Sequence, residues 1–147
     1  MLLVIAVTVL FALSPPDHRL VLRDPDTGRT YASYPMAEGA EFSVSFVHSI
    51  NKTPYYDLYE IRDGEIWVTG LQYYSFGAGV PEALDPAWQL TLLPDGGMLV
   101  TGLDTPLEHI IYRVGTVYDH FLHLPEGREV NLTELCGRSS RVELGYR

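Results

Sequence analysis

Apolar and polar residues alternate along much of the chain, in short runs that are separated by turn residues. In residues 41–49, EFSVSFVHS, the side chains of Phe42, Val44 and Phe46 fall on one side of an extended backbone, and serines fill most of the other side. Alternation with a period of two is typical of a half-buried β-strand. Turn signals recur roughly every eight to twelve residues, which predicts an all-β fold: a single antiparallel β-sandwich domain over residues 17–147, or alternatively a small open barrel.

Two turns carry Asp and Gly residues that favour tight hairpins. Residues 25–28 separate HRLVLRD from RTYASYP, and Asp63-Gly64 separates YYDLYEIR from EIWVTGLQYY. Asp and Gly readily adopt the backbone conformations that short hairpin turns require. No amphipathic helix longer than two turns is visible, so any helices are expected to be short.

The first thirteen residues, MLLVIAVTVLFAL, are apolar except for Thr8. A helix of this length spans about 20 Å, less than the roughly 30 Å of a bilayer core, so the run matches a secretory signal better than a membrane-spanning helix. A buried first strand, ended by Pro15-Pro16, is the alternative. We predict that residues 1–14 are an anchor or uncleaved signal-like segment. The domain is then extracytoplasmic and membrane-tethered, in the periplasm or on the outer face of the cytoplasmic membrane.

The balance of charges limits the choice of partners. The formal net charge is −9 and the pI is about 4.8, and the Lys and Arg residues form no cluster, which argues against a nucleic acid as partner. Cys136 is the only cysteine, so neither an intrachain disulfide nor a Cys-based zinc site can form. His120 and His123 are three positions apart, which places them on opposite faces of a strand. We therefore expect no metal and no cofactor.

One polar stretch interrupts the alternation at residues 48–57, HSINKTPYYD. If residues 51–54 form a hairpin loop, His48 lies opposite Asp57 and their side chains share a face within hydrogen-bond reach. The carboxylate would then fix the tautomer of the imidazole and favour its protonated form. Ser49 points to the other face, which argues against a Ser-His-Asp triad, and we assign no catalytic residue.

A second unusual stretch is the glycine-containing loop SFGAGVP at residues 75–81. Its glycines can adopt positive φ values and present successive N–H groups to an anion, although a β-bulge or a crossover between sheets gives the same pattern. If this loop lies beside the hairpin end, the two stretches form one small pocket. The candidate polar cluster, ligand-binding or structural, contains His48, Ser49, Thr53, Tyr55, Asp57, Ser75, Gly77 and Gly79.

The same two stretches carry a resemblance to a known family. HSxxxTPxxD followed by YSFGAGVP, with the apolar N-terminal segment, RVG at 113–115 and HLP at 123–125, resembles a bacterial family of short exported or membrane-tethered proteins known only as a domain of unknown function. The family usually has Glu at the position of Asp57 and Leu at that of Val80. It is often encoded beside TRAP-type transporters of the TAXI class, so the resemblance implies an accessory role in solute uptake and no particular activity.

We therefore expect an extracytoplasmic accessory or binding module, associated with a TRAP-type solute transporter. Its partners would be a small polar ligand, a transporter subunit or a solute-binding protein. An alternative from another class is a hydrolase or isomerase that uses His48 as a general base oriented by Asp57. A third interpretation is a purely structural partner of a transporter subunit, with an exposed apolar patch in place of a pocket.

Overall fold

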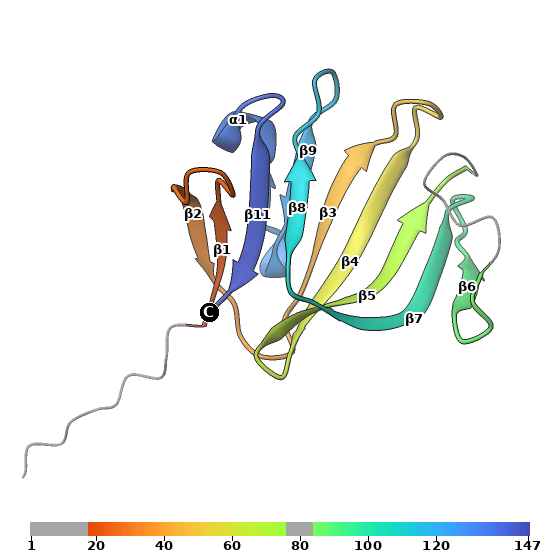
Figure 1. Cartoon of the computed structure of the whole chain (residues 1–147). Coiled ribbons are helices and arrows are strands. Elements are labelled where there is room, and N and C mark those ends of the chain that lie inside the picture. Colours follow the sequence, from red (N-terminus) through yellow and green to blue (C-terminus); the bar gives the residue numbers. More distant parts are fainter. Residues whose placement is uncertain (1–17, 76–83) are drawn as a thin grey trace, which may run out of the picture.

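The structure, a computed structural model, describes residues 18–75 and 84–147, and within them the strands form two antiparallel sheets that pack face to face (Figure 1). The prediction of an all-β sandwich is confirmed, and the sheets do not close into a barrel. The predicted anchor at residues 1–14 lies outside the described residues. In the part of the chain that the structure describes, no helix is long and apolar enough to cross a membrane.

The small sheet has four strands among the described residues, in the order β2, β1, β11, β8. These strands are β1 (Arg19–Arg23), β2 (Thr30–Pro35), β8 (Ile110–Arg113) and β11 (Arg141–Tyr146). The first and last strands of the described chain, β1 and β11, pair in the middle of this sheet. The small sheet is therefore assembled from segments that lie far apart in the sequence.

The large sheet has seven strands within residues 18–75 and 84–147, in the order β10, β9, β3, β4, β5, β7, β6. They are β3 (Glu41–Val47), β4 (Pro54–Arg62), β5 (Glu65–Tyr73), β6 (Gln89–Leu92), β7 (Met98–Leu107), β9 (His120–His123) and β10 (Glu129–Asn131). Two short helical segments, η1 (Pro125–Gly127) and α1 (Leu132–Cys136), follow β9 and β10. Figure 1 shows β5, β7 and β6 extending to one side of the small sheet.

The main core lies between the sheets and follows from the alternation in the sequence. Leu20, Leu22 and Leu144 of the small sheet are at most 1% exposed, and Val44 and Ile61 of the large sheet are fully buried. Burial of one such side chain contributes about 1.5–3 kcal/mol, so these rows hold the sheets together. A second cluster on β4, β5 and β7 contains Tyr55, Leu71, Tyr73, Met98 and Val100.

The hairpin turn predicted at Asp63-Gly64 is confirmed. Both residues have positive φ values, 54° and 74°, and Arg62 pairs with Glu65 across the turn. Turns of this kind match the right-handed twist of the flanking strands. They join β4 and β5 into the long hairpin that carries several of the predicted site residues.

A bulge in β7 bends the sheet beside this hairpin. Thr69 on β5 faces residues 102–104 of β7, and Gly102 has a φ of 88°. The strands approach closely at the adjacent Gly70, where a Cβ atom would lie 2.4 Å from the carbonyl oxygen of Val100. Only glycine fits there without a shift of the backbone.

Candidate functional site

The β3–β4 hairpin carries most of the predicted cluster, but its register differs from the predicted one. Asp57 pairs with Val44 and not with His48. The N–H of His48 donates instead to the carbonyl of Thr53 over 2.9 Å, so residues 49–52 form the four-residue loop, two positions earlier than the predicted 51–54. Lys52 turns the loop with a φ of 55°, and its N–H returns to the carbonyl of His48. The predicted pairing of His48 with Asp57 is wrong, because four positions, roughly 13 Å of strand, separate His48 from Val44.

Asp57 is held inside the sandwich. The hydroxyl of Tyr112, on β8 of the small sheet, donates to Oδ2 of Asp57 over 2.5 Å. Tyr112 is also hydrogen-bonded to Tyr59, and because the proton of Tyr112 points at Asp57, Tyr59 is the donor. Burial raises the pKa of Asp57, although the hydrogen bond from Tyr112 acts in the opposite direction and lowers it. Burial also raises the pKa of Tyr112 well above its usual value. The three side chains form one hydrogen-bonded chain that links the two sheets.

His48 lines a different feature, a pocket of about 590 Å³ at one end of the sandwich. Residues 46–49 form one side of the pocket, and residues 113–118, with His120, form the other. Figure 1 shows the β3–β4 loop and the β8–β9 connection at the same end of the molecule. Nδ1 of His48 is buried, and it has no hydrogen-bond partner among the described residues. A buried polar atom without a partner costs about 1–3 kcal/mol, so a ligand group that bonded this nitrogen would recover that energy.

Other predicted residues gather at the same end. Ser49 is exposed and lines the pocket. The hydroxyl oxygens of Thr53 and Ser75 lie 3.2 Å apart, which ties the hairpin to the residue that opens the glycine loop. Gly77 and Gly79 lie outside the described residues. A ligand role for this cluster stays a prediction.

Tyr55 faces the interior, where it belongs to a row of stacked rings. Its ring centroid lies 5.2 Å from that of Phe46 and 6.4 Å from that of Tyr73, and Phe46 stacks at 5.0 Å on His120. Burial raises the pKa of Tyr55 to about 12 and lowers the pKa of His120. Nδ1 of His120 accepts from the N–H of Gly115 over 3.2 Å. Tyr55 is therefore a core residue, and the row connects the core to the pocket.

Sequence reasoning missed the side of the pocket formed by residues 113–118. The pairing of β3 with β9 brings this segment beside His48, and a pairing between strands so far apart leaves no trace in local alternation. One local signal was available in the RVG tripeptide. A Cβ atom at Gly115 would lie 2.4 Å from the carbonyl oxygen of Tyr118, so the connection turns tightly only with glycine there.

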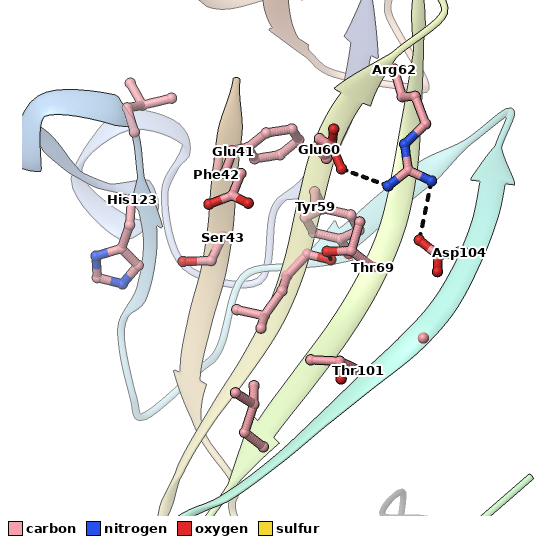
Figure 2. Close-up of a pocket in the computed structure, with 14 residues that line it drawn as sticks. Glu41, Phe42, Ser43, Tyr59, Glu60, Arg62, Thr69, Thr101, Asp104 and His123 are labelled. Carbon is pink, nitrogen blue, oxygen red and sulfur yellow. Dashed lines mark hydrogen bonds and ion pairs between the residues drawn. The ribbon is translucent and has the colours of Figure 1, made fainter. Parts of the chain in front are cut away.

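A second depression, of about 540 Å³, lies on the large sheet beside the β7 bulge (Figure 2). Figure 2 shows Arg62 between Glu60 and Asp104. The N–O distances of these two ion pairs are 2.6 Å and 3.1 Å. The guanidinium carbon also lies 5.0 Å from the ring centroid of Trp67. The arginine in this depression is thus already paired within the fold.

His123 borders the same depression, whereas His120 faces the core, as predicted for positions three apart. Nε2 of His123 is 2.7 Å from the hydroxyl of Ser45, and Nδ1 is 3.3 Å from a carboxylate oxygen of Glu129. Hydrolases use this order of hydroxyl, imidazole and carboxylate. Here, however, Ser45 is only 7% exposed, and its strand is paired on both sides. The backbone N–H groups of this strand are hydrogen-bonded within the sheet and therefore cannot stabilise an oxyanion. The arrangement orients the ring of His123 and is structural.

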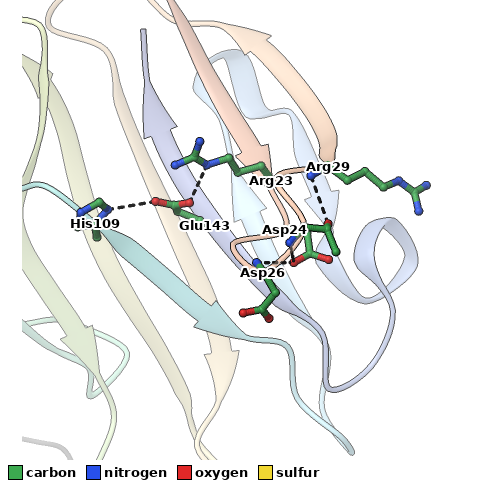
Figure 3. Close-up of polar contacts among 7 residues, drawn as sticks. Arg23, Asp24, Asp26, Arg29, His109 and Glu143 are labelled. Atoms are coloured by element: carbon green, nitrogen blue, oxygen red, sulfur yellow. Dashed lines mark hydrogen bonds and ion pairs between the residues drawn. The ribbon is translucent and has the colours of Figure 1, made fainter.

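The small sheet has a polar contact of its own (Figure 3). Glu143, which is 7% exposed, accepts a hydrogen bond from Nε of Arg23 over 2.7 Å and lies 3.1 Å from Nδ1 of His109. The hydrogen bond from Arg23 lowers the pKa of Glu143. Figure 3 also shows Asp24 accepting from the N–H of Asp26, which closes the β1–β2 turn. No three His, Cys, Asp or Glu side chains within residues 18–75 and 84–147 are placed to hold a metal ion.

Fold and pocket together define the class of protein: an antiparallel β-sandwich domain with a pocket where β3 ends. Residues 42–132 match the family model described as Domain of unknown function (DUF1850), and the chain belongs to this family. The predicted membership in a family of unknown function is confirmed. The matched segment runs from β3 to the first residue of α1 and contains the pocket residues. No curated protein and no solved structure matches the chain.

Proposed function

We propose that this protein is an extracytoplasmic binding module, which holds a small ligand or a partner at the pocket beside His48. Residues 1–14 tether the domain to the membrane in this proposal. The domain serves as an accessory of a TRAP-type solute transporter, and its protein partner is a transporter subunit or the solute-binding protein. The apolar N-terminal sequence and the transporter genes often found beside the resembling family support this part of the proposal.

The pocket is the observation that carries the binding role. Its volume of about 590 Å³ falls in the range of ligand sites, roughly 300–1,000 Å³. Apolar side chains such as Val114 and Val117 line it together with a few polar ones, which include His48 and Ser49. This mixture is typical of sites that bury an apolar body and orient it through a small number of hydrogen bonds.

The borders of the pocket also suit contact with a protein partner. Ile50, on the β3–β4 loop, is 66% exposed, and Val117, on the β8–β9 connection, is 72% exposed. Both loops contribute lining residues. Large apolar side chains exposed beside a pocket are favourable contacts for a bound partner.

The hydrolase or isomerase alternative loses its basis in the observed register. A general base needs a group that orients it, and Asp57 was the predicted one. Asp57 is instead hydrogen-bonded to Tyr112, and no described residue bonds Nδ1 of His48. We therefore do not extend the proposal to catalysis.

Native mass spectrometry of the full-length protein, purified from membranes with its co-purifying molecules, tests the proposal. We expect the protein in the membrane fraction and a bound small molecule or transporter component. Thr116→Trp, an exposed position in the lining, should displace what binds, whereas Ile111→Trp, an exposed position of β8 outside the lining, should not. Equal binding by both variants would contradict the assignment of the pocket, and a protein found only in the cytoplasmic fraction would contradict the tether.

A further inference from the structure

The charge of the pocket lining contrasts with that of the whole chain. The chain has 19 Asp and Glu residues against 10 Lys and Arg residues. No Asp or Glu of the described residues lines the pocket, but Arg113 does, together with His48. An anion that entered this pocket would therefore meet a cation and hydrogen-bonding side chains without a carboxylate among them.

The guanidinium of Arg113 is available for a ligand. Among the described residues it has no carboxylate within ion-pair distance, and its hydrogen bond runs to the carbonyl oxygen of Ser139 over a long 3.4 Å. Arg141, directly opposite Arg113 on β11, differs in this respect because it pairs with Asp26 at 2.6 Å. Two neighbouring arginines of the small sheet thus have different surroundings, and the one at the pocket is without a counter-ion from the described fold.

The carboxylate that lies nearest in sequence to the lining residues 113–118 also has other hydrogen-bond partners. Asp119 follows the lining segment, but its carboxylate accepts hydrogen bonds from Asn131 over 3.0 Å and from Arg138 over 2.8 Å. These contacts lower the pKa of Asp119, with the hydrogen bond from Asn131 the largest cause. Lys52, on the loop that follows His48, has no carboxylate within ion-pair distance in the described part of the chain. Of these groups, Arg113 lines the pocket itself and gives it local positive charge on an acidic domain.

Both sides of the pocket also contribute apolar side chains. Phe46, Val47, Val114 and Val117 contribute hydrocarbon surface. A ligand that matched this lining would have an apolar body and one anionic end. A highly charged or wholly polar ligand would leave this surface poorly matched.

From this arrangement we infer that the ligand is a small organic acid with a single carboxylate and an apolar body. The carboxylate bonds the guanidinium of Arg113, which suits a planar, two-oxygen acceptor, and His48 and Ser49 supply further hydrogen bonds. The apolar body lies against Phe46 and Val114. This inference rests on the proposed function, because it names the ligand class for the pocket assigned there.

Calorimetric titration of the full-length protein in detergent with matched compounds tests the ligand class. The compounds are monocarboxylates from butanoate to octanoate, with benzoate, and the neutral amide of each. We expect at least one acid to bind at least tenfold more tightly than its amide, because a hydrogen bond to a charged group is stronger than one to a neutral group. Amides that bind as tightly as the acids would overturn this inference and leave the proposed binding function standing. Binding by neither series, to protein that carries no co-purifying molecule, would overturn both.

A variant and its matched control locate the carboxylate. Arg113→Gln should weaken binding of the tightest acid at least tenfold without changing its amide, and Arg113→Lys should restore part of the loss. Arg141→Gln, which removes the neighbouring arginine that pairs with Asp26, should leave the affinity unchanged. Unfolding temperatures of all three variants report whether they fold. Equal losses in Arg113→Gln and Arg141→Gln, or no loss in either folded variant, would overturn the role of Arg113.

Discussion

His48 and Asp57 come from the same hairpin and were expected to form one site, yet their surroundings differ. Asp57 receives a hydrogen bond from Tyr112, which in turn receives one from Tyr59, and these three side chains lie between the sheets. His48 lies at the end of the hairpin beside a pocket, with Nδ1 buried and without a described partner. A buried polar residue that is hydrogen-bonded within the fold stabilises the fold. A buried polar residue at a pocket that lacks a hydrogen-bond partner indicates where an outside group binds.

The largest expected effect comes from breaking the hydrogen bonds that join Asp57, Tyr112 and Tyr59 between the sheets. Tyr112→Phe removes the donor to Asp57 and the acceptor of Tyr59, and should lower the free energy of unfolding by about 1–3 kcal/mol. Urea denaturation followed by circular dichroism measures the change. Tyr56→Phe is the control, because Tyr56 is half-buried beside His123 and its hydroxyl has no hydrogen bond within the described residues; it should change stability by less than about 0.5 kcal/mol. Equal effects of the two variants would contradict the account.

Asp57 should also leave a signature in the pH dependence of stability. Folding raises the pKa of this carboxyl above its ordinary 3.8, so the folded protein binds the proton more tightly than the unfolded chain. The protonated carboxyl therefore contributes its full stabilisation below about pH 4, and this contribution is lost as the pH rises through the raised pKa. Each tenfold gain in proton affinity on folding corresponds to about 1.4 kcal/mol of that contribution. Asp57→Asn cannot titrate, so denaturation series from pH 4 to pH 8 should show a smaller loss in the variant. Superimposable series for the two proteins would argue against burial of a titrating carboxyl.

A smaller effect is expected where the hairpin end meets Ser75. Thr53→Val removes a hydroxyl that lies 3.2 Å from that of Ser75 and should cost about 0.5–1.5 kcal/mol. Adding Ser75→Ala should cost little more, since the hydrogen bond is already lost. Thr91→Val, at an exposed position of β6, is the control and should be close to neutral. Additive losses in the double variant would mean that the two hydroxyls act separately.

The smallest effect on stability is expected at His48 itself. His48→Phe keeps a ring of similar shape and removes the nitrogen that lacks a partner, so the free energy of unfolding should stay within about 0.5 kcal/mol or rise. The same variant should weaken ligand binding at the pocket. A loss of more than about 1 kcal/mol in the ligand-free protein would show that His48 serves the fold, as Asp57 does.

The sequence predicted the fold well and the site only in part, for identifiable reasons. The alternation in residues 41–49 and the Asp63-Gly64 turn are local signals, and both gave the observed strands and hairpin. The predicted β3–β4 register is wrong because the loop consists of residues 49–52, where Lys52 adopts a positive φ, and an argument from loop length does not show which four residues form the turn. Tyr112 and the 113–118 segment reach the hairpin through pairing of distant strands, so no local pattern could place them.

Two double-mutant cycles test most directly whether His48 and Asp57 belong to different parts of the molecule. The free energy of unfolding would be measured for His48→Ala, Asp57→Ala and Tyr112→Phe and for the two double variants that contain Asp57→Ala. We predict a coupling below about 0.5 kcal/mol between His48 and Asp57, and a coupling above about 1 kcal/mol between Asp57 and Tyr112. Strong coupling of His48 to Asp57, with none between Asp57 and Tyr112, would contradict the account.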